Sequence, residues 1–275
     1  MADLQANIEE LWERRDELSP TDGDAAAIVT EAINLLDSGE ARVAEVDAAI
    51  DQVVVHEWLK EAILLLFRLR GMETIEHGPF EYADKLPLKH GFEAAGVRAL
   101  PGASARWGSF LARGVVLMPS YVNIGAYVGE NTMVDTWATV ASCGQIGARV
   151  HLSGGVGIGG VLEPPNAVPV VVEDDAFIGS RCMVTGGARV GRGAVLGAGS
   201  FLDPSIPVID AETGEEFSRG HVPPWCVAIR ASRRREYPGG EFFIPCVLII
   251  KRLDEGERHD KAQLNDILRA HGAST

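Results

Sequence analysis

The sequence is short of cysteine, of basic residues and of long apolar runs, and each shortage argues against a class of protein. It has 25 Lys and Arg against 39 Asp and Glu, a formal charge of −14, which argues against a general surface for nucleic acid or anionic membrane. Its longest strongly apolar run, Ala62 to Phe67, is far shorter than the roughly 20 residues that cross a bilayer. We therefore expect no transmembrane segment and neither a nucleic-acid nor a membrane partner.

The four cysteines carry no CxxC pair and no metal-ligand spacing. They are Cys143, Cys182, Cys226 and Cys246. No secretory leader precedes them, because Met1 to Glu10 is already polar and acidic. We expect reduced thiols in a cytoplasmic protein.

Glycine, by contrast, is abundant and unevenly placed. The chain has 31 glycines in 275 residues, against a usual share of roughly 7%. Nineteen of them lie between Gly102 and Gly199. Such clustering is typical of a repeat architecture.

A six-residue repeat of apolar residues runs through this glycine-rich region. Its first run is Phe110, Val116, Val122, Val128, Val134, Val140, Ile146, Leu152 and Ile158. The second run is Val172, Ile178, Val184, Val190, Leu196 and Leu202. A small residue usually follows four positions later, often with glycine beside it, which is the hexapeptide pattern of a parallel β-helix.

In such a fold, three short strands close a triangular coil, and residues eighteen apart stack into an apolar column. The fifteen repeats predict about five coils, with Phe110 stacked on Val128 and Val116 on Val134. A β-sandwich would need alternating apolar residues and polar turns at 8 to 12 residue spacing, which are absent. The proline-rich break at residues 160–171 predicts an external loop, with its prolines favouring a semi-rigid lid.

The flanking segments predict a domain at each end of the β-helix. Helical spacing appears near Leu4 to Leu18, at Ala25 to Leu36 and at Val54 to Leu69, with a short strand at Arg42 to Val46. Beyond the repeats, Cys226 to Arg230 and Phe242 to Lys251 predict strands, and Lys261 to Ala270 a helix. We therefore expect a helical domain at 1–95, a β-helix at 96–210 and a small β/α cap at 211–275.

Basic residues concentrate in the cap although the whole chain is acidic. Nine of them are Arg219, Arg230, Arg233, Arg234, Arg235, Lys251, Arg252, Arg258 and Lys261. They fit a site for a multiply phosphorylated ligand such as coenzyme A, whose extended arm could lie along backbone amides between coils. The alternative is solvated loop charge.

Several long segments resemble the tetrahydrodipicolinate N-succinyltransferase family. They are Leu117–Val128, Met133–Thr139, Val150–Pro164, Glu13–Arg15, Leu36–Gly39, Arg42–Glu45 and Trp58–Lys60. The resemblance implies a left-handed parallel β-helix in a homotrimer with active sites between subunits. It also implies transfer of the succinyl group of succinyl-CoA to the amine of ring-opened tetrahydrodipicolinate, on the route to diaminopimelate and lysine.

The same resemblance assigns substrate-binding residues. It implies that Arg98 binds a substrate carboxylate and that Asp135 is the catalytic residue, holding the amine or accepting its proton. Trp137 is expected to form a wall of that pocket, and Ser153 to contact substrate. From the residues alone, Arg98 could instead form a surface ion pair and Asp135 could stabilise a corner through an Asx turn.

Coenzyme A is the only cofactor that we expect, as a co-substrate and without a metal. The candidate residues along its path are Gly157, Gly159, Ala198, Arg230, Lys251 and Arg258. Many hexapeptide acyltransferases use a histidine as general base, but the resembled family does not use the one at His151. Carbonic anhydrases on the same coil need three metal-binding histidines, and the repeat has only His151.

Three departures from the family pattern all lie in the C-terminal half. The segment Phe177–Met183 ends in methionine where the family has a glutamate beside the substrate amine. Arginines at 233–235 and the segment Glu255–Arg258 also differ. The alternatives are therefore a paralogue that uses another acyl-CoA, such as acetyl-CoA, or a related amino-diacid in secondary metabolism, and a non-catalytic scaffold.

Overall fold

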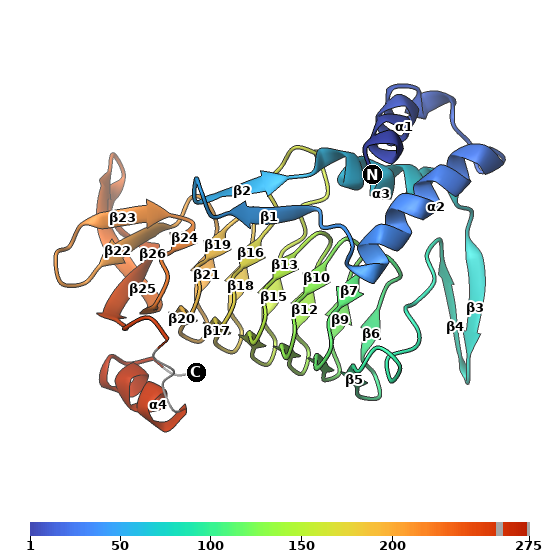
Figure 1. Cartoon of the computed structure of the whole chain (residues 1–275). Coiled ribbons are helices and arrows are strands. Elements are labelled where there is room, and N and C mark those ends of the chain that lie inside the picture. Colours follow the sequence, from blue (N-terminus) through green and yellow to red (C-terminus); the bar gives the residue numbers. More distant parts are fainter. Residues whose placement is uncertain (257–260, 274–275) are drawn as a thin grey trace.

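The computed structural model describes residues 1–256 and 261–273, arranged along one axis (Figure 1). Helices α1 (Ala2–Glu13), α2 (Gly23–Ser38) and α3 (Glu57–Leu69) pack together at one end, with a 3-10 turn at Arg15–Glu17. Their buried apolar faces form one core, which includes Ile8, Ile33 and Ile63. No helix in the described ranges is long and apolar enough to cross a membrane.

The middle of the chain is the predicted left-handed β-helix, built from three parallel sheets that we call the first, second and third faces. The first face contains β5 (Arg98–Ala99), β8 (Val116–Leu117), β11 (Met133–Val134), β14 (His151–Leu152), β17 (Phe177–Ile178) and β20 (Val195–Leu196). The second contains β6 (Ser104–Ala105), β9 (Tyr121–Val122), β12 (Thr139–Val140), β15 (Gly157–Ile158), β18 (Met183–Val184) and β21 (Phe201–Leu202). The third contains β7 (Phe110–Leu111), β10 (Tyr127–Val128), β13 (Gln145–Ile146), β16 (Val171–Val172), β19 (Arg189–Val190) and β24 (His221–Val222).

The second residue of each short strand points inward, and from β6 onward it is buried. These inward residues stack from coil to coil. Val128 pairs with Ile146 on the next coil, and Ile146 with Val172. Two predicted register positions were wrong. The inward residues of β7 and β8 are Leu111 and Leu117, so Phe110 and Val116 face outward.

A shorter turn explains the wrong register. From Val122 onward the inward residues follow the predicted six-residue spacing, but Leu117 and Val122 are only five apart. Because the outward neighbours Phe110 and Val116 are also apolar, the pattern alone could not distinguish the two registers. The first coil strands, β5 and β6, precede the first repeat residue, Phe110, and fall within the predicted range of 96–210. Each of the three faces has six strands of the coil.

A β-hairpin from the N-terminal part covers the outside of the third face. It consists of β1 (Ala44–Asp47) and β2 (Gln52–Val55), which lie along the coils in Figure 1. Arg42 Nε donates to Gln145 Oε1 at 3.1 Å, and Arg189 pairs with Asp51 at 2.6 Å. The predicted helix start at Val54 was wrong, because Val54 and Val55 belong to β2, and a second hairpin of β3 (Glu73–His77) and β4 (Phe80–Asp84) was not predicted.

The proline-rich loop at 160–171 lies outside the coil and is held by a buried lysine. Lys60 of α3 donates from Nζ to the carbonyl oxygens of Pro164 and Ala167, at 3.1 and 2.6 Å. Removal from water lowers the pKa of Lys60. The loop connects the second face to the third, so it leaves the β-helix at a different corner from Asp135.

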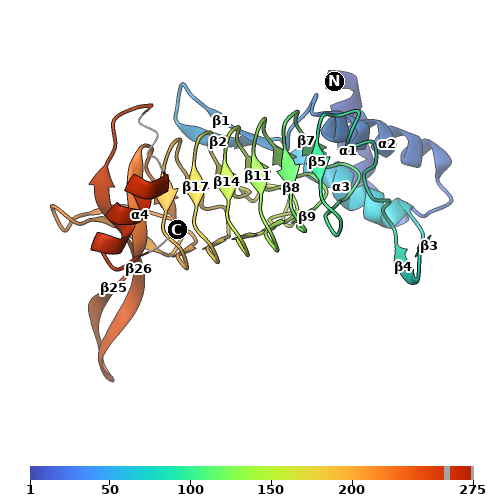
Figure 2. The same cartoon turned by 90° about the horizontal axis from the view of Figure 1, so that it is seen from below.

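The C-terminal part closes the other end of the β-helix. It contains β22 (Pro207–Asp210), β23 (Glu216–Arg219), β25 (Cys226–Tyr237), β26 (Gly240–Arg252) and α4 (Lys261–Ala270). Strands β25 and β26 are longer than predicted and form a hairpin that extends beyond the coils in Figure 2. The division into units at residues 95 and 210 stays a prediction.

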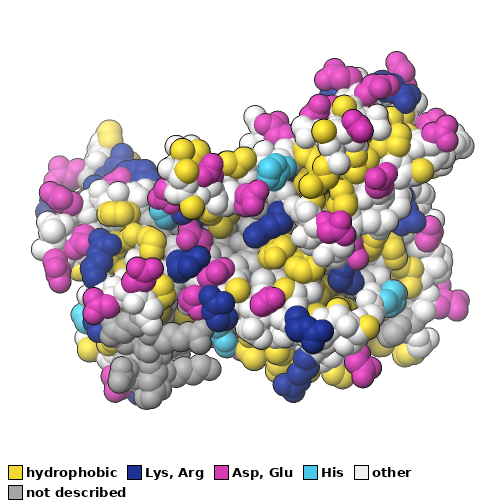
Figure 3. Space-filling view, in the orientation of Figure 1, with side chains coloured by type: hydrophobic (Ala, Val, Ile, Leu, Met, Phe, Trp, Pro, Cys, Tyr) yellow, Lys and Arg dark blue, Asp and Glu magenta, His cyan; other side chains and the backbone are white. Residues whose placement is uncertain are grey.

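Charged side chains are mixed on the face of the molecule seen in Figure 3. Lys and Arg are interspersed with Asp and Glu there and do not merge into one basic surface. Elsewhere in the described chain, too, opposite charges pair, as Arg149 does with Asp175 at 2.7 Å.

Truncating one stacked residue is expected to destabilise the fold substantially. Ile146 is fully buried between Val128 and Val172. We expect Ile146→Ala to lower the free energy of unfolding by about 2–5 kcal/mol, because it leaves a cavity that rigid coils cannot collapse. Urea denaturation measures this, with exposed Glu130→Ala as the control; equal midpoints for the two variants would contradict the stacked core.

Candidate active site at a corner of the β-helix

Four of the predicted site residues, Asp135, Trp137, Ser153 and Ala198, lie at the corner where the first face turns into the second. Asp135 and Ser153 directly follow β11 and β14, and their coils are adjacent, with Asp135 N donating to Leu152 O at 2.9 Å. Ala198 follows β20 at the same corner two coils further on. The six-residue repeat therefore brings together side chains that are far apart in the sequence.

The two carboxylate oxygens of Asp135 have different surroundings. Oδ1 accepts hydrogen bonds from Thr136 N at 2.6 Å and from Thr136 Oγ1 at 3.2 Å. Oδ2 lies 3.9 Å from His151 Nε2. One oxygen is thus held by the next residue, Thr136, and not in the Asx turn of the alternative, whose donor would be the N–H two residues on. The other oxygen faces an ionisable group.

His151, which the sequence argument set aside, is next to the leading catalytic candidate. It lies on β14, one coil after β11, and its ring stacks on Phe177 with centroids 5.0 Å apart and planes at 4°. The signal in the sequence was the eighteen-residue stacking rule, which places His151 beside Met133 and hence close to Asp135.

Trp137 projects from this corner into solvent. It is 72% exposed and has φ of +60°, a backbone region that non-glycine residues rarely occupy. Its backbone N–H donates to Pro119 O at 2.7 Å, which holds the turn. The predicted outward orientation is confirmed. The positive φ is a property of the coil turns, because Asn131, Arg149 and Arg181 at other turns share it.

On β15 and just after it, Gly157 and Gly159 lie beneath larger side chains of the next coil. We call this pair the glycine step. A Cβ on Gly157 would lie 2.4 Å from Met183 Sδ, and one on Gly159 would lie 2.9 Å from Thr185 Cγ2. Met183 is 43% exposed, so an apolar thioether occupies the outer surface where the resembled family has its glutamate.

Two of the predicted coenzyme A residues are in direct contact. Arg230 Nη1 donates to Ala198 O at 3.2 Å, and its guanidinium lies over Gly199. Lys251 is exposed on β26, where it pairs with Val227. Arg258 lies outside the described residues.

Arg98 lies on the N-terminal side of Asp135 along the first face, whereas Ser153 and Ala198 lie on its C-terminal side. It is exposed on β5, the first strand of the first face, and two strand spacings separate it from β11. At about 4.8 Å per spacing, its backbone lies about 10 Å from that of the Asp135 strand. A long guanidinium side chain can cover part of that distance.

The buried cysteines are poor nucleophiles. Burial raises the pKa of Cys143 to about 12 and that of Cys182 to about 11. In residues 1–256 and 261–273, all four thiols are free, and no group of three His, Cys, Asp or Glu side chains could hold a metal ion. The chemistry available at the corner is therefore that of a carboxylate, an imidazole and guanidiniums.

Two protein families match parts of this chain, and full-length relatives match nearly all of it. Residues 169–204 match the family described as the hexapeptide repeat of succinyl-transferase, and residues 3–69 match the N-terminal part of tetrahydrodipicolinate N-succinyltransferase. A 2,3,4,5-tetrahydropyridine-2,6-dicarboxylate N-succinyltransferase from Methylorubrum extorquens is 47% identical over 98% of this chain and 99% of its own length. One from Caulobacter vibrioides is also 47% identical, over 98% of this chain and 100% of its own.

Solved structures support the fold. A Campylobacter jejuni structure described as a 2,3,4,5-tetrahydropyridine-2-carboxylate N-succinyltransferase superposes with a TM-score of 0.51 and 19% identity, covering 84% of this chain and 63% of that one. The repeats place this protein among the hexapeptide-repeat proteins. It belongs to the tetrahydrodipicolinate N-succinyltransferase family.

Two glycines near the corner are expected to respond differently to an added methyl group. In Gly157→Ala the new Cβ meets the flexible end of Met183, whereas in Gly179→Ala it meets Ala198 N at 2.5 Å, which is backbone. We expect Gly157→Ala to change the free energy of unfolding by less than about 1 kcal/mol, and Gly179→Ala to lower it by about 3 kcal/mol. Thermal denaturation compares them, and the reverse order would contradict the packing described.

Proposed function

We propose that this protein transfers the succinyl group of succinyl-CoA to the amine of ring-opened tetrahydrodipicolinate, on the route to diaminopimelate and lysine. The observation that carries the proposal is the Asp135 carboxylate, with one oxygen held by Thr136 and the other facing His151 at the corner of the β-helix. Near full-length similarity to succinyltransferases supports it. The same proposal places the protein in the cytoplasm with reduced cysteines.

The proposed chemistry assigns Asp135 the role of general base. The substrate nitrogen attacks the thioester carbonyl, the C–N bond forms, the C–S bond breaks and coenzyme A leaves as the thiolate. Asp135 Oδ2 accepts the proton that the amine loses. His151 is a positioning residue in this scheme, because its stacked ring lies 3.9 Å from that oxygen.

The other site residues bind the two substrates. Arg98 suits a substrate carboxylate, because a guanidinium can donate two parallel hydrogen bonds to it. Trp137 and Ser153 contact substrate at the same corner. The extended arm of coenzyme A is proposed to pack over the glycine step at Gly157 and Gly159, on the side chains that overlie it.

The cap is proposed to hold the other end of coenzyme A. Arg230, already at the corner through Ala198 O, and Lys251 and Arg258 supply positive charge for the coenzyme A phosphates. In this arrangement the donor runs from the cap along the corner toward Asp135.

Met183 supports a second candidate within the same chemistry. A thioether can neither accept a proton nor pair with an ammonium group, so Asp135 acts without the second carboxylate. A different acyl donor, such as acetyl-CoA, or a related amino-diacid acceptor is therefore the alternative function.

Replacing the proposed base is expected to abolish most of the activity. We expect Asp135→Asn to lower kcat/KM about 100- to 10,000-fold, because the amide accepts no proton. Release of thiol from succinyl-CoA and from acetyl-CoA, each with tetrahydrodipicolinate, measures both turnover and donor choice.

The controls separate the possible outcomes of that assay. Exposed Asp16→Asn is expected to keep full activity, and circular dichroism checks that both variants fold. Release from acetyl-CoA alone would favour the alternative donor, and release from neither would favour a non-catalytic scaffold.

We further propose a homotrimer with active sites between subunits. Trp137, Met183 and Phe201 are 72%, 43% and 43% exposed on or beside the second face of a single chain. A neighbouring copy packed on this face would bury their apolar surface and enclose the corner.

The mass of the protein in solution tests the proposed trimer. We expect light scattering to give about three times the chain mass of 29.4 kDa. Phe201→Asp should lower the mass and the activity together, because it introduces a charge into the proposed interface. Phe80→Asp, in the β3–β4 hairpin, is the matched control and should leave both the mass and the activity unchanged. A monomeric but fully active native protein would contradict the proposal.

A further inference from the structure

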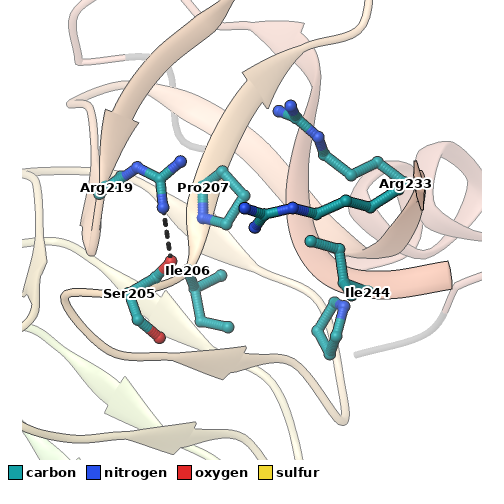
Figure 4. A pocket seen from close by; sticks show the side chains of 8 residues that line it. Ser205, Ile206, Pro207, Arg219, Arg233 and Ile244 are labelled. Carbon is teal, nitrogen blue, oxygen red and sulfur yellow. Dashed lines mark hydrogen bonds between the residues drawn. The ribbon is translucent and has the colours of Figure 1, made fainter. Parts of the chain in front are cut away.

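The C-terminal cap contains a pocket that the proposed function does not use. It is a pocket of about 290 Å³ between β22, β23 and the β25–β26 hairpin, with Ser205 and Ile206 from the turn before β22 (Figure 4). Three of the residues that line it are arginines, in a chain with a net charge of −14. The pocket is therefore a local concentration of positive charge.

The arginines approach the pocket from both sides of an apolar floor. Arg219 comes from β23, and Arg233 and Arg235 come from β25, while Pro207 and Ile244 lie between them. Figure 4 shows Arg219 and Arg233 on opposite sides of Pro207. Guanidiniums placed in this way can donate to one anionic group from several directions.

A single carboxylate partly balances this charge. Glu216 Oε1 lies 2.7 Å from Arg219 Nε, and Glu216 Oε2 lies 3.2 Å from Arg233 Nη1. Arg235 has no carboxylate within ion-pair distance in the described part of the chain, and its guanidinium lies 5.2 Å from the centre of the Tyr237 ring. One acidic group for three arginines leaves the pocket with an excess of positive charge.

Two contacts hold the guanidinium of Arg219 at the edge of the pocket. Its Nη1 donates to Ser205 O at 3.1 Å, and its Nε pairs with Glu216. These two contacts fix the plane of the guanidinium. Because the arginine is held in place, less side-chain freedom is lost when a ligand binds.

The pocket lies on the opposite side of β25 from Arg230, which contacts the corner of the β-helix. Side chains alternate along a β-strand, so Arg230 and Arg233 point to opposite faces of β25. Arg230 contacts Ala198 at the corner of the β-helix, whereas Arg233 lines the cap pocket. The proposed donor-binding residues therefore do not account for Arg219, Arg233 and Arg235.

We propose that this cap pocket binds an organic phosphate, with the phosphate between the guanidiniums and an attached ring system on the floor of Pro207 and Ile244. Phosphate matches the multiple donors that the arginines present, and the apolar floor suits a flat ring. Two sources carry this chemistry. One is the adenosine 3′-phosphate end of coenzyme A, which rests on the proposed function, and the other is a free nucleotide.

Calorimetric titration of the full chain with adenosine 3′,5′-bisphosphate tests the proposal. Arg235→Gln and Arg233→Gln are each expected to weaken binding about tenfold, because each removes a charged hydrogen-bond donor. Arg234→Gln is the matched control: Arg234 pairs with Glu236 and Glu241 and does not line the pocket. It is expected to bind within about twofold of the native protein. Because no acyl transfer is involved, this result is independent of whether the proposed reaction is correct.

Kinetics then identify the source of the phosphate. If the bisphosphate competes with succinyl-CoA, and Arg235→Gln raises the KM for succinyl-CoA with kcat unchanged, the ligand is the end of the donor. If it binds through Arg235 but leaves that KM unchanged, the ligand is a free nucleotide. Equal binding by the Arg235→Gln and Arg234→Gln variants, or equal affinity for adenosine without phosphate, would overturn the proposal. Equal affinity for inorganic phosphate would overturn the role of the apolar floor.

Discussion

The stacking of each coil on the next is the interaction on which the rest of this structure depends. One coil cannot bury its own inward residues, because a triangle of three short strands is open above and below. Val128, Ile146 and Val172 bury one another only as a column, and the backbone hydrogen bonds of each coil are made to its neighbours. Both the apolar burial and the hydrogen bonding are thus shared between coils, which makes the array stable as a unit.

The same stacking builds the site. Asp135, His151 and Ala198 are separated by many residues in the sequence, yet they lie along the corner between the first and second faces because every coil repeats the same turn. Close backbone packing keeps this corner rigid: Gly179 lies so near Ala198 that even a methyl group would not fit. A rigid corner suits a reaction in which a carboxylate must stay directed at one nitrogen.

The two ends of the β-helix are covered by different kinds of contact. At the N-terminal end, α3 uses buried Lys60 to hold the loop of 160–171, so a charged amine replaces the water that two carbonyl groups would otherwise need. At the C-terminal end, the cap sheet covers the last coil and gathers arginines on two faces of one strand. Alternation along β25 separates Arg230 from Arg233 and so allows two basic sites within a few residues.

The sequence predicted the architecture well wherever spacing carried the information. The hexapeptide period, the outward orientation of Trp137 and the helices of the N-terminal part were all readable, because each follows from a local periodicity. The inward register of β7 and β8 was not, because Phe110 and Leu111, like Val116 and Leu117, are both apolar and one turn is a residue shorter. The β3–β4 hairpin was missed for a different reason, since its strands are short and β4 buries no face against a core.

Contacts between distant segments were decided by the tertiary structure alone. No spacing in the sequence shows that Lys60 holds the loop of 160–171 or that Arg219 meets Arg233 and Arg235 around one pocket. The eighteen-residue spacing brings His151 near Asp135, but only the structure shows which carboxylate oxygen faces the imidazole. By itself the sequence determined the β-helix, its approximate extent and the residue types available for acyl transfer. Local periodicity sets which face a side chain occupies, but the packing of separate segments sets which side chains meet.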